Sequence, residues 1–291
     1  MTPTDQLPPP PPPPPITLPP PVPPPGPRPV QPGRPARTGW LVAGAVALVL
    51  ALGWGTYQMI GLVAHEKRTF VERFDAAAVS TIEIRTDNGH VTVIGRDGLS
   101  EVVVTSNVTE SLRSPRRRAD RRADRLVLDA DCPRFAGQWC SADYVVETPR
   151  DMALDIDSEN GSIEIRGIDG DVVAFTDNGR IEVVDASGAL ELDSDNGRVT
   201  AEGLRSSWVK ACSDNGRIEL EFLAEPDEVV AETSNGRVEV IVPRTDATYR
   251  LELDSDNGDV NEEIRTDPAS RRLIRAESDN GSVTVRYPDT R

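Results

Sequence analysis

The stretch LELDSDNGRVTA, residues 190–201, contains the repeated pattern from which the fold can be predicted. At its centre is the four-residue turn SDNG, and similar turns, with Ser or Thr first or second and Asn-Gly last, occur eight times along the chain. From the second copy on, the glycines lie 18 to 23 residues apart, a period typical of repeat architectures. The repeated pairs are Asn88 and Gly89, Asn160 and Gly161, Asn178 and Gly179, Asn196 and Gly197, Asn215 and Gly216, Asn235 and Gly236, Asn257 and Gly258, and Asn280 and Gly281.

The residues around each turn alternate between apolar and polar. Six and four residues before each Asn the chain is apolar in every copy, as at Leu190 and Leu192. Three and five residues after it the chain is apolar again, except that the seventh copy has Glu262. Alternation with a period of two is typical of a strand with one buried face. Each repeat is therefore predicted to be a strand, an Asn-Gly turn, a second strand and a looser turn.

Two architectures fit this unit. Asn-Gly between alternating strands is a strong signal for a β-hairpin, so a meander of hairpins is one alternative. The other is a β-solenoid, an all-β fold in which each repeat of about 18–23 residues is one coil and equivalent strands stack in parallel. The Ser or Thr two residues before the Asn favours the solenoid, because stacked coils align these side chains. We expect inward-phase hydroxyl and amide ladders between coils.

Charge is distributed unevenly along the chain. The net charge is −16; residues 1–68 carry five basic and two acidic groups, a net of +3, so the remainder carries −16 − 3 = −19. Nucleic acid is a poor partner for so acidic a segment, because phosphates are repelled. Cationic partners or divalent ions suit it better, although acidity also serves solubility alone.

The N-terminal segment and the stretch that follows it differ sharply in composition. Residues 1–38 hold 19 of the 26 prolines, which predicts a disordered polyproline tail, either a spacer or a docking ligand for a cytoplasmic partner. Residues 39–64 carry no charged side chain and predict a single transmembrane helix. We expect a cytoplasmic N-terminus and an extracellular C-terminal domain. Residues 65–79 are then a connector, and residues 80–287 the solenoid, with an irregular capping segment at 100–148.

The predicted capping segment contains two notable clusters. Residues 111–125 hold seven arginines, which indicate a solvated loop or short helix, or an anion-binding patch. Cys132 and Cys140 lie eight apart, which in an exported domain predicts a disulfide; zinc is a poorer alternative because no His is near. Cys212 has no partner in this scheme, and its register places it on the outer face.

A family resemblance covers most of the repeats. Residues 144–188 read YVVETPRDMALDIDSENGSIEIRGIDGDVVAFTDNGRIEVVDASG. The entry at Pro149, the S-x-N-G-x-I-x-I turns and the spacer at residues 167–170 resemble the bacterial β-strand-repeat family labelled "putative adhesin", a domain of unknown function. Cys132, Pro133, Cys140 and Tyr144 are similar to versions from high-GC Gram-positive bacteria. The resemblance covers residues 80–287 and implies a β-helical, surface-exposed or membrane-tethered domain, sometimes linked to envelope stress, with no catalytic residues.

One column of side chains is a candidate binding feature. The residue before the Asn is acidic in seven turns and Ser234 in the other; the acids are Asp87, Glu159, Asp177, Asp195, Asp214, Asp256 and Asp279. Stacked in a solenoid, these carboxylates repel one another, so calcium or nearby arginines should compensate them. The arginines two residues after the Asn are Arg180, Arg198, Arg217 and Arg237. Arginine pairing is the prediction, since the turns lack the calcium β-roll pattern.

No catalytic motif stands out in the sequence. There is no G-x-S-x-G, H-E-x-x-H or phosphate-binding loop, so we expect no catalytic, cofactor or metal site. The sequence predicts a non-catalytic, membrane-tethered surface protein that binds an envelope polymer or a surface protein. One alternative is an envelope-stress sensor that signals through its tail. Another is a glycan-active enzyme whose site lies within residues 107–148.

Overall fold

A computed structural model describes residues 35–63, 66–110, 116–132 and 140–289. The chain divides into two compact units, residues 1–54 and 55–291. The first unit holds most of helix α1, and the second holds all the strands described below. The proline-rich residues 1–34 lie outside the described part, so the predicted disorder of the tail is not tested.

Helix α1 (Pro35–Val63) is apolar along its described side chains. Its window Gly39–Thr56 has a mean hydropathy of 1.7, and Trp40 and Leu41 are among the large apolar side chains that it exposes. The helix begins at Pro35, four residues before the predicted start at residue 39, so residues 35–38 are helical and not part of the tail. By length and composition α1 suffices to cross a membrane or to act as a signal for export.

The second unit is built almost entirely from strands arranged in two sheets, and a short 3₁₀ turn, Ala76–Ala78, links β1 to β2. Sheet A has the order β1-β4-β7-β3-β9-β11-β13-β15-β17-β21-β19, and sheet B the order β18-β20-β16-β14-β12-β10-β8-β2-β6-β5. The strands are β1 (Glu66–Asp75), β2 (Thr81–Asn88), β3 (Val91–Arg96), β4 (Glu101–Glu110), β5 (Arg116–Arg122), β6 (Arg125–Asp131), β7 (Ser141–Pro149), β8 (Ala153–Asn160), β9 (Ile163–Ile168), β10 (Val172–Thr176), β11 (Ile181–Ala186), β12 (Leu190–Ser194), β13 (Val199–Leu204), β14 (Trp208–Ser213), β15 (Ile218–Phe222), β16 (Glu228–Asn235), β17 (Val238–Ile241), β18 (Arg250–Ser255), β19 (Val260–Glu263), β20 (Leu273–Asn280) and β21 (Val283–Arg286).

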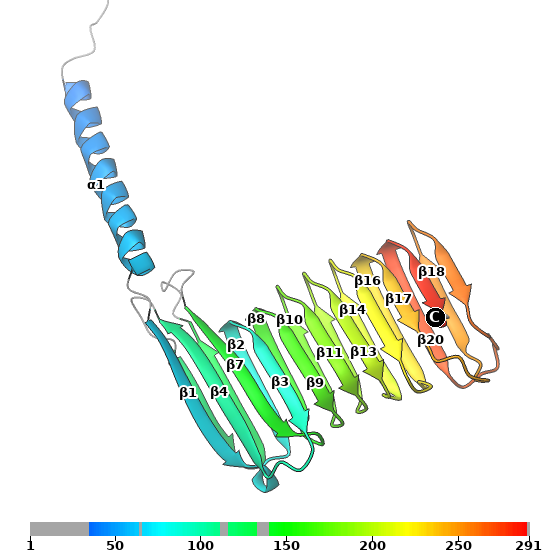
Figure 1. The fold of residues 1–291 in the computed structure, drawn as a ribbon. Coiled ribbons are helices and arrows are strands. Elements are labelled where there is room, and N and C mark those ends of the chain that lie inside the picture. The colour runs from blue at the N-terminus through cyan, green and yellow to red at the C-terminus, as the bar shows by residue number, and fades with distance from the viewer. Residues whose placement is uncertain (1–34, 64–65, 111–115, 133–139, 290–291) are drawn as a thin grey trace, which may run out of the picture. The chain divides into compact units, whose positions relative to one another are not determined.

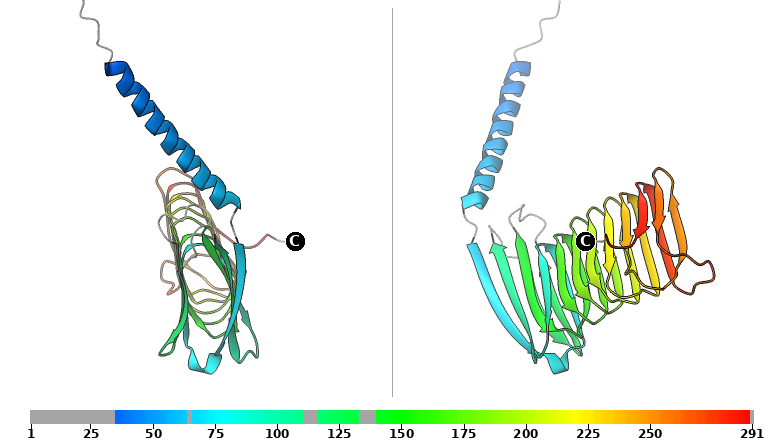
Figure 2. Two further views of the ribbon diagram at one scale, coloured as in Figure 1. Left: turned by 90° about the vertical axis from the view of Figure 1, so that its left-hand side faces the viewer. Right: turned by 45° about the vertical axis from the view of Figure 1, so that its right-hand side comes forward.

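Strands on the two sides of an Asn-Gly turn belong to different sheets, so each turn joins sheet B to sheet A (Figure 1). Equivalent strands of neighbouring coils pair in parallel: Val172 of β10 lies between Leu154 of β8 and Leu190 of β12. The solenoid is therefore confirmed and the hairpin meander is wrong. Viewed along the stack, the coils lie one behind another, with the apolar core between the two sheets (Figure 2).

The coils do not stack in sequence order at the C-terminal end. The eighth copy of the repeat, coil β20–β21, lies between β16–β17 and β18–β19, so the seventh copy is outermost. This arrangement accounts for Glu262, the polar exception in the pattern. Its strand β19 pairs on one side only and is exposed along its length, so a carboxylate there is not buried.

A similar exchange occurs at the N-terminal end. Strands β6 and β7 stack on the outer side of β2 and β3, with Tyr144 paired to Val91. Together they form a regular coil, and a disulfide joins Cys132, directly after β6, to Cys140, directly before β7, as predicted. Residues 125–131 and 141–149 are therefore not an irregular cap, because their alternating apolar residues extend the core.

The cap itself is antiparallel. Strand β4 pairs antiparallel with β7 and with β1, and β5 pairs antiparallel with β6. The predicted connector 65–79 is thus wrong in part, since β1 occupies residues 66–75. The arginine-rich segment is a strand from residue 116 onward and not a loop or helix; its Arg113 lies outside the described residues. Hairpin pairing with β6 explains this, because long polar side chains suit an edge strand.

Glycine is required in the turns because the coils approach closely. A Cβ added to Gly197 would lie 1.7 Å from the carbonyl oxygen of Gly179, and one added to Gly216 would lie 1.7 Å from that of Gly197. Positive φ is not the reason at these two turns, since neither glycine adopts it. Glycine recurs in these turns because the carbonyl group of the neighbouring coil leaves no room for a side chain, and not because of hairpin geometry.

The Ser, Thr and Asn side chains of the turns link neighbouring coils. The buried Ser194 hydroxyl donates to the carbonyl oxygen of Gly179 at 2.9 Å, and equivalent bonds recur in the next coils, so the hydroxyls bond backbone and not one another. The Asn side chains are largely exposed, contrary to the inward prediction. They form an amide ladder with bonds of 3.1–3.3 Å in the stacking order Asn160, Asn178, Asn196, Asn215, Asn235, Asn280 and Asn257.

Candidate functional site

The outer face of sheet B is strongly acidic. One row of carboxylates is the predicted turn column. A second row lies two residues earlier in each strand, three residues before the Asn, and sequence reasoning missed it. The signal was present, because this position is acidic in five of the eight copies. Its carboxylates are Asp157, Asp193, Glu232, Asp254 and Glu277.

A shallow groove of ≈ 490 Å³ lies where the two rows meet at β2, β6, β8 and β10. It is lined by six carboxylates, one guanidinium and one aromatic ring. The lining side chains include Asp87, Asp129, Asp131, Asp157, Glu159, Asp177, Arg85 and Phe175. Two of these carboxylates, Asp129 and Asp131, come from β6, which follows β2 by about 40 residues in sequence. Only the exchanged coil order brings them beside β2, so the groove could not be assembled from the repeat pattern.

The carboxylates of the groove are poorly compensated. Arg85 forms an ion pair with Glu83 at 2.8 Å, a residue outside the groove. Partial burial, and then the neighbouring Asp131, raise the pKa of Asp129, although Arg118 and Arg85 oppose the shift. Partial burial raises the pKa of Glu159, and Asp87 and Asp177 add to the effect. The contributions of the neighbouring acids to these shifts indicate negative potential at this surface, which favours a cationic occupant.

The arginines predicted to balance the turn column do not do so. In the described part of the chain, none of Arg180, Arg198, Arg217 and Arg237 forms an ion pair; Arg237 instead donates to the Ser282 hydroxyl at 3.1 Å. The backbone gives the reason. The turn acids end strands of sheet B, whereas these arginines precede strands of sheet A, so the two sets lie on different sides of the turn edge.

The calcium alternative finds no preformed site. Among the residues that the structure describes, no group of three or more His, Cys, Asp or Glu side chains is arranged to hold a metal ion. Carboxylates within one row lie on adjacent strands, about 4.8 Å apart. They form a line of negative charge and do not surround a point where a calcium ion could be coordinated. The groove geometry therefore suits an extended or multiply charged cation.

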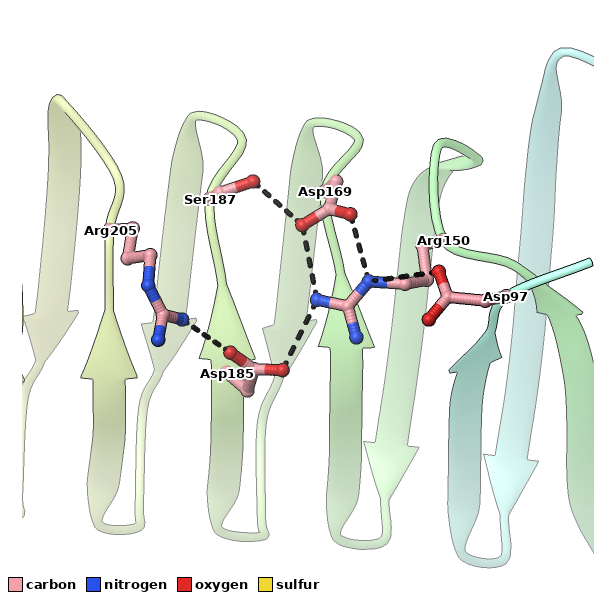
Figure 3. A network of polar contacts seen from close by, with 6 residues as sticks. All are labelled: Asp97, Arg150, Asp169, Asp185, Ser187 and Arg205. Carbon is pink, nitrogen blue, oxygen red and sulfur yellow. Dashed lines mark hydrogen bonds and ion pairs between the residues drawn. The ribbon is translucent and has the colours of Figure 1, made fainter.

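On the opposite edge of the solenoid a second carboxylate cluster is fully paired (Figure 3). Arg150, in the turn after β7, contacts Asp169 at 2.8 Å, Asp185 at 3.1 Å and Asp97 at 4.0 Å. Asp185 also accepts from Arg205 at 2.6 Å, and Asp169 from the Ser187 hydroxyl at 2.8 Å. We call these six residues the Arg150 network. It ties together the loops of several successive coils.

The guanidinium groups shift the titration of this network. The Arg150 hydrogen bond lowers the pKa of Asp169, the Arg205 hydrogen bond lowers that of Asp185, and the Asp169 carboxylate raises that of Arg150. Asp185 adopts a φ of 57°, whereas Gly167 and Gly203 occupy the equivalent places in the neighbouring coils. Asp tolerates this left-handed conformation better than most residues, and its carboxylate is then held by both arginines.

Cys212 lies on the outer face of sheet B, as its register predicts. Its thiol is unpaired and half-buried. Burial, reinforced by Asp193, raises its pKa to about 11, so the reactive thiolate is scarce at neutral pH. We assign it no chemical role.

A family model described as Toastrack DUF4097 matches residues 141–288, half of the chain. The chain belongs to the Toastrack family. Among solved structures, it overlaps a "putative cell adhesion protein" from Clostridium sporogenes with a TM-score of 0.39 and 8% identity, over 77% of this chain and 100% of that one. A "putative adhesin" from Bacteroides fragilis overlaps with a TM-score of 0.37 and 13% identity, over 77% and 98%. No curated protein matches the chain.

The Toastrack match divides the acidic groove. Asp157, Glu159 and Asp177 lie inside the matched residues, whereas Asp87 and Asp129 precede them. The groove is thus formed where the Toastrack repeats meet a segment outside the family match. Most of the Arg150 network, by contrast, belongs to the Toastrack part.

Proposed function

We propose that this protein is a non-catalytic, membrane-tethered Toastrack protein of the cell surface that binds a cationic ligand in its acidic groove. The ligand is a lysine- or arginine-rich segment of an envelope protein. In this proposal α1 crosses the membrane once, with the N-terminus in the cytoplasm and the solenoid outside. The length and hydropathy of α1 support the anchor, and the disulfide suits an oxidising compartment.

The single observation that carries the proposal is the uncompensated charge of the groove. Six carboxylates line the groove, and Arg85, the guanidinium among the lining residues, is already paired with Glu83. Arg118 of β5 lies opposite Asp129 and offsets part of the charge at that end of the groove. A multivalent cation would relieve this repulsion and would bind faster and more tightly at low salt. Phe175 lies on the same surface and offers a ring face to a guanidinium or ammonium group. A lysine-rich strand laid across β8 and β10 would meet both rows of acids.

Binding and not catalysis is proposed because the acids of the groove follow the repeat. The carboxylates of the two rows recur along sheet B, whereas general acid–base chemistry needs a local pair with distinct environments. In the groove, the pKa values of Asp129 and Glu159 are shifted in the same direction. These two carboxylates are therefore not split into a distinct acid and base, and a row of charge suits electrostatic attraction of a ligand along a surface.

The test uses the full chain in lipid nanodiscs and a fluorescent eight-residue peptide of lysine and glycine in equal numbers. The groove variant Asp157→Asn/Glu159→Gln/Asp177→Asn is expected to bind at least ten-fold more weakly than the wild type. Its matched control, Glu202→Gln/Glu219→Gln/Glu221→Gln, removes the same charge from the outer face of sheet A and should bind like the wild type. An equal loss of peptide affinity in both variants would contradict the proposal, because it would show that the peptide responds to the net charge of the protein and not to the groove.

A further inference from the structure

The two ends of the solenoid carry opposite charge. At the N-terminal end, β5 is the last strand of sheet B and has the sequence RRRADRR, a net of +4. Arg117 turns inward, where it pairs with Glu72 and lies over the ring of Phe70. The side chains of Arg116, Arg118 and Arg122 remain exposed. Within the described residues, Arg116 and Arg122 contact no carboxylate.

The C-terminal end is acidic. Its outermost coil, β18–β19, spans residues 250–263 and carries six carboxylates against Arg250, a net of −5. Asp254, Glu262 and Glu263 are exposed and form no ion pair in the described part of the chain. The exchanged coil order is responsible, because it places the least apolar repeat outermost.

The C-terminal end is also less completely covered than the N-terminal one. Antiparallel strands β1, β4 and β5 close the N-terminal end, and Phe70 and Phe74 pack on the core there. At the other end β18 and β19 are parallel edge strands with one unpaired side each. Their inward-phase Leu251 and Leu253 are only half-buried, and Val260 is 44% exposed. Unpaired edges of this kind accept a further strand.

Strands β18 and β5 are the opposite edges of sheet B, and β19 and β1 are the opposite edges of sheet A. The N-terminal end is stepped, because β4 and β1 lie beyond β7 in sheet A whereas only β5 lies beyond β6 in sheet B. A second copy placed end to end can therefore continue one sheet but not both, and the oppositely charged edge strands β18 and β5 belong to sheet B. Its β5 would run antiparallel to β18, since β5 is antiparallel to β6. The exposed arginines would then face Glu252 and Asp254 on the outer face of sheet B.

We propose that copies of this chain associate head to tail, with the acidic edge strand β18 of one copy against the basic edge strand β5 of the next. Contacts between two like ends are disfavoured because they juxtapose charges of one sign. A head-to-tail contact is heterologous, so it leaves one free end of each kind and allows rows of molecules to grow. The inference rests on the ends alone and does not depend on the groove or its ligand.

The experiment is sedimentation velocity of the full chain in detergent micelles over a range of concentrations. The basic-end variant is Arg116→Glu/Arg118→Glu/Arg122→Glu, and the acidic-end variant is Asp254→Lys/Glu262→Lys/Glu263→Lys. The wild type is expected to self-associate at about 50 mM salt and to dissociate at about 500 mM, where charges are screened beyond roughly 4 Å. Each variant alone should associate at least ten-fold more weakly, and an equimolar mixture should regain association.

Matched controls carry the same change in net charge at mid-solenoid positions. Arg180→Glu/Arg198→Glu/Arg217→Glu matches the basic-end variant, and Glu202→Lys/Glu219→Lys/Glu221→Lys matches the acidic-end variant; both should associate like the wild type. The proposal is overturned if only the acidic-end variant loses association, which indicates contact between two C-terminal ends. It is equally overturned if neutralising the groove abolishes association, which indicates sideways docking of β5, or if no salt-sensitive association occurs.

A second measurement leaves the charge of the ends almost intact. Arg118→Cys in one copy and Asp254→Cys in another, each in a Cys212→Ser background, are mixed and treated with a short bis-maleimide. Head-to-tail stacking predicts that the mixture gives crosslinked pairs in at least five-fold excess over either variant alone. Equal yields with the mixture and with the single variants would contradict the proposed contact.

Discussion

The acidic groove and the Arg150 network are both clusters of carboxylates on the same solenoid, but they differ in how the negative charge is compensated. In the network, Asp169 and Asp185 each contact a guanidinium, and their pKa values are lowered. In the groove, desolvation raises the pKa values of Asp129 and Glu159, and neighbouring acids add to the shift. Paired charge of the first kind supports folding, whereas the unpaired charge of the second kind is available to a ligand.

The largest expected effect on peptide binding comes from placing lysines in the groove. Glu159→Lys with Asp177→Lys replaces two negative charges by two positive ones beside Asp87 and Asp157. We expect binding of the lysine-glycine peptide to fall about 100-fold, which corresponds to about 2.7 kcal/mol. Titration of the full chain in nanodiscs by fluorescence anisotropy measures the change. The control Glu219→Lys/Glu221→Lys alters charge equally on sheet A and should change affinity less than three-fold.

The converse change makes the network resemble the groove. Arg150→Met removes the central guanidinium and leaves Asp169 facing Asp185 without it. We expect the midpoint of thermal unfolding to fall by about 2–4 °C, or about 1 kcal/mol; the effect is modest because both carboxylates are more than a third exposed, at 42% and 44%, so solvent screens them. Circular dichroism measures the midpoint. Arg180→Met is the control and should leave the midpoint unchanged, and a similar loss there would contradict the assigned pairing.

Lowering the pH should change the contributions of the two regions to folding stability in opposite directions. Asp169 and Asp185 have lowered pKa values, so their contribution to stability is present above about pH 4 and is lost as the pH falls through their folded pKa values. Glu159 has a raised pKa, so its contribution is present at low pH and is lost as the pH rises through the folded pKa.

Urea unfolding at a series of pH values measures both effects. Relative to the wild type, Glu159→Gln should be more stable at pH 7, with the difference vanishing below about pH 4. Arg150→Met should be less stable at pH 7, with its difference vanishing at still lower pH. Differences of the same sign for the two variants would contradict the contrast between groove and network.

The smallest expected effect concerns the proline-rich segment. Deleting residues 2–34, before the start of α1, should leave peptide affinity and the unfolding midpoint unchanged, because the groove lies wholly within the solenoid. In-cell crosslinking with mass spectrometry then compares the deleted and full-length chains. A cytoplasmic protein captured only by the full-length chain would support the signalling alternative over a simple surface binder.

The sequence predicted the coil but not the order of the coils. The alternation around each Asn-Gly turn and the aligned Ser or Thr indicated parallel stacking, which the pairing of Val172 between Leu154 and Leu190 confirms. Local patterns carry no record of which coil lies next to which, since every coil presents similar edges. The coil β20–β21 stacks between β16–β17 and β18–β19. The sequence signal for this order was Glu262, which is too polar for the core of an interior coil.

The candidate site was predictable only in part, for the same reason. The turn column that contains Asp87 and Asp177 follows directly from the repeat. Asp129 and Asp131 enter the groove because β6 stacks on β2, which is a tertiary fact. The expected compensation by Arg180 failed because the turn reverses the chain between acid and base and places them on different sheets.

Occupation of the acidic groove by a cationic ligand is tested most directly by mapping where the peptide binds. The lysine-glycine peptide, carrying one photoreactive group, is bound to the full chain in nanodiscs, irradiated and located by mass spectrometry. We expect crosslinks concentrated at residues 85–87, 129–131, 157–159 and 175–177, which excess unlabelled peptide removes. Crosslinks spread evenly along sheet B, or found chiefly on sheet A, would contradict it.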